Sequence, residues 1–135
     1  MSPRPALMVP DPGRPLAVVA ESLYLANLLI APGVAFLMIA WLWLTRRTAT
    51  TALGRNHLHQ AFAVSLWGGA LLVLVCVAVV ATLGLTSAWT WTLVILYFTC
   101  IHSTLVVFGI LGLSKALAGQ PYVYPLIGPA IPPAR

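Results

Sequence analysis

The sequence predicts an all-α integral membrane protein. It should have three transmembrane helices, a kinked first helix and then a tight helical hairpin, between extended Pro-rich N- and C-terminal arms. Hydrophobic residues make up 61% of the 135 residues and charged residues only 7%, which is too apolar for a water-soluble domain of this length. Three apolar runs, at about 23–44, 61–85 and 89–113, are each long enough to cross the hydrocarbon core of a bilayer.

Residues 1–20 are predicted to form an extended arm rather than a signal peptide. Proline and charge interrupt this stretch up to Leu16, whereas a signal peptide has an uninterrupted apolar run and a small-residue cleavage site. The two acidic residues of the chain, Asp11 and Glu21, both precede the first apolar run. We therefore expect no intramembrane carboxylate, no proton relay and no catalytic set of side chains.

The membrane domain is expected over residues 21–115. Its first span contains Pro32 and Gly33 near the middle, which predicts a kink whose freed carbonyl groups are satisfied by a neighbouring helix. The second and third spans are separated only by residues 86–88. A link of that length allows only a tight helical hairpin.

The basic residues predict an orientation, because loops rich in Lys and Arg stay in the cytoplasm. The three spans divide these residues five to two: Arg46, Arg47, Arg55, Lys115 and Arg135 against Arg4 and Arg14. We therefore expect a protein of the bacterial inner membrane, with the 46–56 link and the C-terminus on the cytoplasmic side and the N-terminus outside. The net charge of +5 is assigned to this orienting role and not to nucleic acid, since the cations flank apolar runs.

The stretch RNHLHQAF at residues 55–62 raises the question of a metal site, because it contains His57 and His59. If Asn56 is the N-cap, the helix begins at His57, and residues two apart then point about 200° away from each other. One metal ion cannot take both rings in that geometry. The two cysteines lie inside apolar runs and fit no zinc-ligand spacing, so we expect no metal site.

His102 is the remaining candidate for a cofactor contact. In an antiparallel hairpin that turns near residue 87, it lies about 20 Å along the helix axis from His59. This offset excludes a haem held by two histidines of this chain. A haem, pigment or quinone shared with a partner chain stays open, since an ionisable residue inside a bilayer is a candidate for function. The alternative is a neutral histidine that packs between closely approaching helices.

Residues 116–135 are predicted to be an extended tail, because Pro121, Pro125 and three later prolines prevent a regular helix. Tyr122 and Tyr124 would then lie along the cytoplasmic interface.

The start of the second span should meet this tail, because the third span ends on the same side of the membrane. We therefore expect His57 or Asn56 to contact the tail backbone. The residues predicted to hold the tail or a partner are His57, Asn56, Tyr122, Tyr124 and Pro125.

Three stretches resemble one known family: LANLLIAPGVAFLMIAWLW, HLHQAFAVSLWGG and SKALAGQPYVYPLIG. They are similar to small bacterial membrane proteins that resemble the twenty-kilodalton Tic component of the chloroplast inner-envelope import translocon. His57, Ala61 and Phe62 fall on family positions, whereas Ala63 and Val123 depart from the pattern. The resemblance implies a small helical membrane protein and, as a function, a translocon-like or membrane-insertion factor.

The function predicted first is a non-catalytic small subunit that packs against and stabilises a larger membrane complex. Bioenergetic assemblies for respiratory or photosynthetic electron transfer are the expected complexes. The chain would be no enzyme and hold no cofactor of its own, and its partners would be membrane lipid and other membrane-protein subunits. Two alternatives stay open: a subunit that contacts a cofactor, pigment or quinone through His102, and the translocon-like factor.

Overall fold

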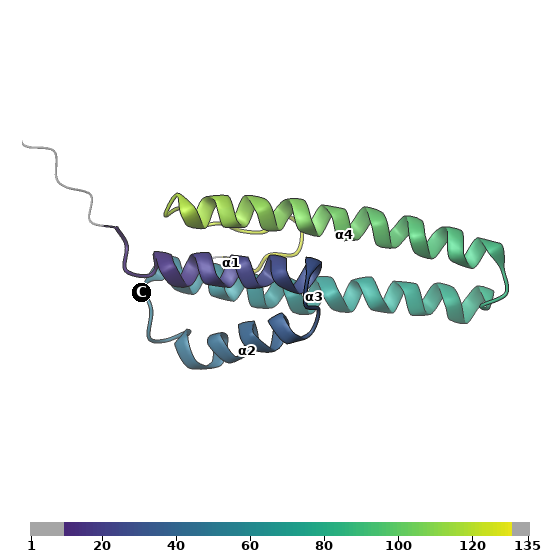
Figure 1. Ribbon diagram of the computed structural model, residues 1–135, viewed down its shortest axis with the longest axis horizontal. Coiled ribbons are helices and arrows are strands. Elements are labelled where there is room, and N and C mark those ends of the chain that lie inside the picture. The colour runs from purple at the N-terminus through teal and green to yellow at the C-terminus, as the bar shows by residue number, and fades with distance from the viewer. Residues whose placement is uncertain (1–9, 131–135) are drawn as a thin grey trace, which may run out of the picture.

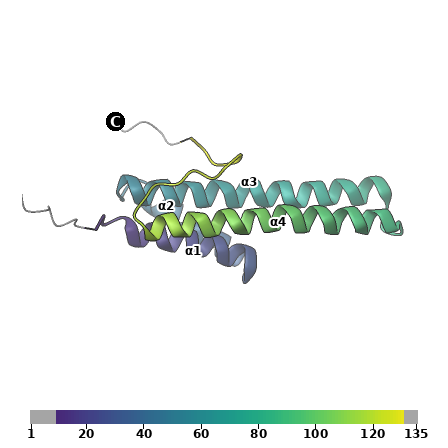
Figure 2. The same cartoon turned by 90° about the horizontal axis from the view of Figure 1, so that it is seen from above.

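The computed structural model describes residues 10–130, and this part of the chain has four α-helices and no β-strand. The helices are α1 (Arg14–Leu29), α2 (Val34–Arg46), α3 (Ala52–Leu83) and α4 (Ala88–Leu117). Helices α3 and α4 form a long antiparallel hairpin, and α1, α2 and the tail surround one half of it (Figures 1 and 2). The expected all-helical fold is confirmed, with four helices in place of three.

Helices α3 and α4 are long and apolar enough to cross a membrane, by length and composition. At about 1.5 Å per residue, each is about 45 Å long or more and exceeds a hydrocarbon core of about 30 Å. Gly84 has φ +77° at the turn between them, and its carbonyl accepts a hydrogen bond from Thr90 Oγ1 at 2.6 Å. The tight hairpin therefore closes through a glycine in the left-handed region and a local side-chain bond.

The segment expected to be one kinked span is instead two antiparallel helices. Helix α1 ends at Leu29, and Gly33 adopts φ +83°, which side chains other than glycine rarely adopt. The Gly33 N–H donates to Asn27 Oδ1 at 3.0 Å, which fixes the turn back onto α1. Helix α2 then returns along α3 toward the end from which α1 started (Figure 1).

Helix α3 begins earlier than the sequence indicated. Thr51 has extended backbone angles, and its hydroxyl accepts a hydrogen bond from the Gly54 N–H at 3.4 Å, as an N-cap does. The predicted N-cap at Asn56 is therefore wrong, and Asn56 and His57 lie inside the helix. Contacts with α1 and with the tail support this polar first part of α3, and local sequence gives no sign of them.

The core lies where all four helices and the tail come together. Its buried apolar residues come from every element: Ala20, Tyr24, Ile39, Leu58, Ala61, Val64, Leu105 and Tyr124. Beyond this core α3 and α4 continue as a two-helix hairpin with many exposed apolar side chains. Such a surface is stable against lipid and not against water.

Candidate functional site: a buried polar cluster between α1, α3 and the tail

Four polar side chains lie inside the four-helix end of the molecule. Glu21 of α1, His57 and Gln60 of α3 and Tyr124 of the tail are each at most 1% exposed. Glu21 Oε1 lies 2.7 Å from His57 Nδ1, and the Tyr124 hydroxyl donates a hydrogen bond to Glu21 Oε2. The sequence placed Glu21 before the first apolar run, whereas the structure has it inside α1, because α1 extends further toward the N-terminus than that run.

The second ring nitrogen of His57 also meets an acceptor. His57 Nε2 lies 2.8 Å from the carbonyl oxygen of Gln120. Two acceptors require hydrogen on both ring nitrogens, unless the Glu21 carboxyl itself holds the proton that it shares with Nδ1. In both forms the His57–Glu21 pair has no net charge, which lowers the cost of its burial.

Small residues make room for this pair. Ala17 and Ala20 of α1 are fully buried, and Gly109 and Gly112 of α4 face α1. A Cβ atom built on Gly112 would lie 2.5 Å from Glu21 Oε2, and one on Gly109 would lie 2.6 Å from Tyr24 Cε1. Helix α1 can therefore approach α4 only because α4 has no side chain at these two positions.

Three polar residues of α3 bind the backbone of the tail. Asn56 Oδ1 accepts a hydrogen bond from the Tyr122 N–H at 2.9 Å, and His57 binds the Gln120 carbonyl. The Gln60 side chain makes two bonds: its Oε1 accepts from the Tyr124 N–H at 3.2 Å, and its Nε2 donates to the Pro129 carbonyl at 2.6 Å. Backbone N–H and C=O groups of the tail thus bond side chains on one face of α3, whereas a β-strand would bond the backbone of a neighbouring strand.

Tyr124 is the side chain that the tail inserts into the core. Its ring meets the Tyr24 ring edge-on, with centroids 5.2 Å apart, and Tyr24 Oη donates to the Leu105 carbonyl at 3.1 Å. Burial raises the pKa of the Tyr124 phenol far above its usual value, and the adjacent Glu21 carboxylate raises it further. The phenol therefore stays protonated and acts as a hydrogen-bond donor.

Pro125 and Tyr122 lie at the edge of this cluster. Pro125 is exposed and opens a turn that the Gly128 N–H closes on the Tyr124 carbonyl at 2.9 Å. Tyr122 is half-buried, with its ring 5.0 Å from that of Tyr124. Both residues shape the tail, and neither contacts the Glu21 carboxylate by a hydrogen bond.

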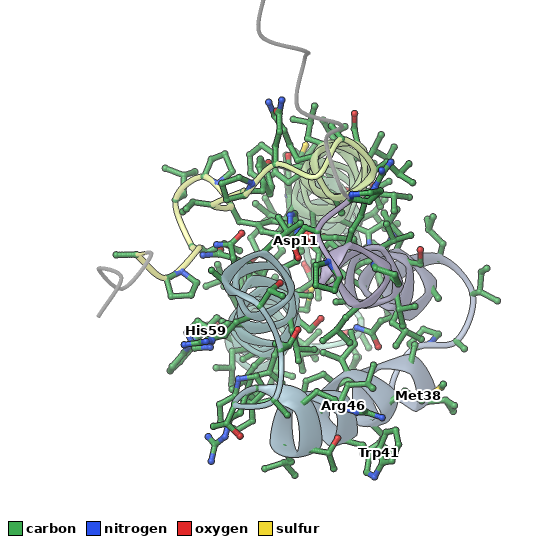
Figure 3. All side chains as sticks on the ribbon, turned by 90° about the vertical axis from the view of Figure 1, so that its left-hand side faces the viewer. Asp11, Met38, Trp41, Arg46 and His59 are labelled. Carbon is green, nitrogen blue, oxygen red and sulfur yellow. The ribbon has the colours of Figure 1, made fainter. Side chains whose placement is uncertain are left out.

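His59 lies apart from His57, on the outer side of α3 (Figure 3). Its Nδ1 accepts a hydrogen bond from Trp43 Nε1 at 3.3 Å. The Trp43 ring stacks on Phe62 at 4.6 Å between centroids, and the Arg47 guanidinium lies 4.3 Å from the Trp43 centroid. His59 therefore helps to join α2 to α3.

His102 lies on α4 next to Ile101, which packs against the core, and one helical turn from Leu105. It is half-buried and stacks on Phe98, with centroids 5.1 Å apart. Between residues 10 and 130, no group of three His, Cys, Asp or Glu side chains is placed to hold a metal ion. The contact of His102 with a shared haem, pigment or quinone stays a prediction.

Sequence reasoning missed Glu21, Gln60, Tyr24 and the two glycines of α4. The available signal was weak: Ala17, Glu21, Tyr24 and Leu28 repeat at a helical spacing and predict one inward face. This repeat starts before the apolar run, in a stretch with prolines on its N-terminal side. The boundary predicted between the arm at residues 1–20 and the membrane domain at 21–115 divides this repeat between two segments.

The geometry limits what the cluster can do chemically. Glu21, His57 and Tyr124 are an acid, a base and a phenol linked by hydrogen bonds. None of the three side chains is accessible to solvent. Each of their polar side-chain atoms already has a protein partner. The cluster can hold α1, α3 and the tail together, and a substrate or ion could reach it only if the tail moved away.

A comparison with protein families identifies the chain. The model of the magnetosome magnetite crystal formation protein family, MamF/MmsF, matches residues 14–131. No match is found among curated proteins or among solved structures. The family match overturns the resemblance to the twenty-kilodalton Tic component, whose motifs were short and mostly apolar. Because the match covers all four helices and most of the tail, the chain belongs to the magnetosome magnetite crystal formation protein family.

Proposed function

We propose that this chain is a non-catalytic protein of the magnetosome membrane that takes part in magnetite crystal formation from within the bilayer. The family match over residues 14–131 is the observation that carries the proposal. Two long helices with exposed apolar faces support insertion in a membrane, with lipid and other membrane proteins as lateral partners. The family gives no support to the expected place in an electron-transfer complex.

An indirect role in mineral growth fits the acidic residues better than direct contact with iron. Iron and other hard cations are bound by carboxylate oxygens, and the whole sequence has only Asp11 and Glu21. Glu21 is fully buried. Asp11 Oδ1 already accepts hydrogen bonds from the Gly13 N–H and from Thr51 Oγ1, both at 2.7 Å. Residues 10–130 of the structure therefore present no cluster of exposed carboxylates on which a mineral could grow.

The buried cluster supports a structural and non-catalytic role. An active site needs a space that substrate can enter, and here the acid, base and phenol are enclosed by α1, α3 and the tail. Their hydrogen bonds join segments that are far apart in the sequence, Glu21 with Tyr124 and His57 with Gln120. The cluster thus gives a small membrane protein a fixed shape with which to contact its neighbours.

The proposal is tested in a magnetite-forming bacterium from which the family genes have been deleted. Expression of this chain should restore crystal diameter, measured by electron microscopy, and a fluorescent fusion should co-purify with the magnetosome membrane. A fusion found there without any effect on crystal size would contradict the proposal, as would a fusion found only in other membranes.

One variant separates indirect action from mineral contact through a carboxylate. Asp11→Asn keeps the oxygen that accepts the two hydrogen bonds and removes the charge, so crystals should match those made with the unaltered chain. If Asp11→Asn loses the effect on crystal size at equal protein level, the carboxylate itself acts on iron and the indirect role is wrong.

A further inference from the structure

Helix α1 begins, and helix α2 ends, at the same end of the molecule. The Arg14 guanidinium, at the start of α1, donates to the carbonyl of Leu117 at the end of α4. Asp11 accepts from Thr51, the N-cap of α3. The start of α1, the end of α2, the start of α3 and the end of α4 therefore lie together (Figure 1).

The α1–α2 hairpin covers only part of the length of α3 and α4. Helix α1 follows α4 from Leu117 to the level of Leu105, whose carbonyl binds Tyr24 Oη. The chain then turns at Gly33 and returns as α2. The turn is apolar and open, with Ile30 81% exposed. The α1–α2 hairpin therefore runs part of the way along α3 and α4 and returns to the end of the molecule from which it started.

The outer face of α2 is apolar along its whole length. Its exposed side chains repeat at helical spacing: Val34, Leu37, Met38, Trp41 and Leu44. Figure 3 shows Met38 and Trp41 on the side of α2 that points away from the other helices. Helix α2 is too short to cross a bilayer, and its free face is apolar. It can therefore contact lipid without crossing the membrane.

The basic residues are confined to the end of the molecule where α1 and α3 begin and α2 and α4 end. The Lys and Arg residues between residues 10 and 130 all lie there: Arg14, Arg46, Arg47, Arg55 and Lys115. The opposite turn, residues 84–87, has no ionisable side chain, and Trp89 and Trp91 follow it with exposed rings. Tryptophan is enriched at membrane interfaces, and cations collect on the cytoplasmic side.

We propose that α1 and α2 form a re-entrant hairpin in the lipid bilayer, so that only α3 and α4 cross. The outer face of α2 contacts lipid acyl chains, and the five cations lie at the headgroups of one leaflet. The segment before α1, the 47–51 link and residues 118–120 at the start of the tail then share the cytoplasmic face. This arrangement replaces the orientation expected from three spans, in which the N-terminal arm lies outside.

The buried cluster favours this arrangement over a crossing first helix. If α1 and α2 straightened into one span, residues before Arg14 would move to the face of the 84–87 turn. Glu21 would then leave His57 and Tyr124, and its carboxylate would have no partner among apolar side chains. The Arg14–Leu117 and Asp11–Thr51 contacts would also be lost.

Cysteine labelling of the full chain in membranes tests the topology. Cys76 and Cys100, both free, are first replaced by alanine. Single cysteines are then introduced at exposed positions as Pro10→Cys, Thr48→Cys and Thr86→Cys. A membrane-impermeant maleimide is applied to spheroplasts and to inverted vesicles. Pro10→Cys should be labelled in the same preparation as Thr48→Cys, and Thr86→Cys in the other one.

The opposite pattern overturns the proposal: Pro10→Cys labelled together with Thr86→Cys means that the first segment crosses. A second variant tests whether the hairpin is in lipid. Met38→Cys should resist the impermeant maleimide in both preparations, because a thiol among acyl chains is not reached and does not form the reactive thiolate, and it should be labelled after the membrane is dissolved in sodium dodecyl sulfate. Labelling of Met38→Cys by the impermeant reagent in either preparation would place α2 in water and overturn the re-entrant hairpin.

Discussion

Glu21 is the residue on which the interior of this protein depends most. A charged carboxylate is costly in an apolar interior, and it is tolerated here because each oxygen meets a hydrogen-bond donor or a shared proton, from His57 or Tyr124. His57 in turn bonds the Gln120 carbonyl. The Glu21 side chain of α1 therefore binds α3 through His57. It binds the tail directly through Tyr124 and indirectly through the bond from His57 to Gln120.

Two substitutions of Glu21 should separate the role of hydrogen bonding from the role of charge. In Glu21→Gln the amide N–H can donate to His57 Nδ1, and the amide oxygen can accept from Tyr124, so the network stays complete without a charge. We expect a loss of less than about 1 kcal/mol in the free energy of unfolding. Glu21→Ala leaves His57 and Tyr124 without their partner and should cost about 3–5 kcal/mol.

Denaturant unfolding in detergent micelles, followed by circular dichroism, measures both variants. Ser22→Ala, an exposed neighbour on α1, is the control and should leave the unfolding midpoint unchanged. Equal losses for Glu21→Gln and Glu21→Ala would mean that the carboxylate charge, and not the pattern of donors and acceptors, holds the cluster.

Residue-level reasoning from sequence reached part of this cluster. The proline-rich tail, the side of the chain that it would meet and the composition of RNHLHQAF placed Asn56 and His57 near the tail backbone. Glu21 could not be placed in the same way, because its partners lie 36 and 103 positions away along the chain. No local pattern of hydrophobic residues encodes such contacts.

At the scale of elements, the close approach of α1 to α4 explains why α1 is helical at all. Its first turn contains proline and arginine, and its apolar face is interrupted by Glu21. An isolated helix of 16 residues with this composition would be only marginally stable. Packing against Gly109 and Gly112 of α4, with the cluster between, supplies the missing stability.

A glycine substitution tests this contact. In Gly112→Ala the new methyl group would overlap Glu21 Oε2 and lie 2.9 Å from Tyr124 Oη, so α1 or the tail must move, at a cost of about 1–3 kcal/mol. Gly69→Ala is the matched control in α3, where a Cβ meets nothing within 4 Å. It should be neutral or stabilising by up to about 1 kcal/mol, because alanine favours helix over glycine.

Thermal unfolding of both variants in the same detergent gives the comparison. If Gly112→Ala melts at the temperature of the unaltered chain, α1 does not approach α4 as closely as the cluster requires. If Gly69→Ala is as damaging as Gly112→Ala, the loss reflects helix conformation in this protein and not the contact with α1.

The elements differ in how far the sequence determines them. The apolar runs and the short link at 86–88 indicate α3 and α4, because a bilayer requires long apolar helices. The stretch around Pro32 and Gly33 is ambiguous, since a proline followed by glycine in an apolar run is compatible with a kink and with a reversal. Contacts of α1 with α4, far away in the sequence, decide for the reversal.

At the scale of the whole molecule, the tail completes the fold as a fifth segment beside the four helices. It runs along α3 (Figure 2) and places Tyr124 in the core, 1% exposed. The Tyr124 phenol therefore keeps its proton as long as the tail holds this side chain in the core. The sequence indicated an extended tail with two tyrosines near the interface, but the depth of Tyr124 depends on space left by Gly112.

The raised pKa of Tyr124 makes the molecule sensitive to alkali. In the unfolded chain a tyrosine loses its proton near pH 10, whereas in the folded chain burial and Glu21 keep Tyr124 protonated. Above about pH 10 the folded state therefore binds more protons than the unfolded state, and stability falls as pH rises. One such group contributes a slope of about 1.4 kcal/mol per pH unit, and nothing below pH 10.

Denaturant unfolding between about pH 9 and 12 should reveal this slope, and Tyr124→Phe should make it shallower by about one proton. Ser22→Ala, an exposed substitution on α1 that removes no titrating group, is the control and should retain the steeper slope. Tyr124→Phe also loses its bond to Glu21 and starts from lower stability, so the readout is the slope and not the midpoint at one pH. An unchanged slope in Tyr124→Phe would mean that the phenol reaches water while the helices stay folded, and hence that the tail opens without unfolding the rest.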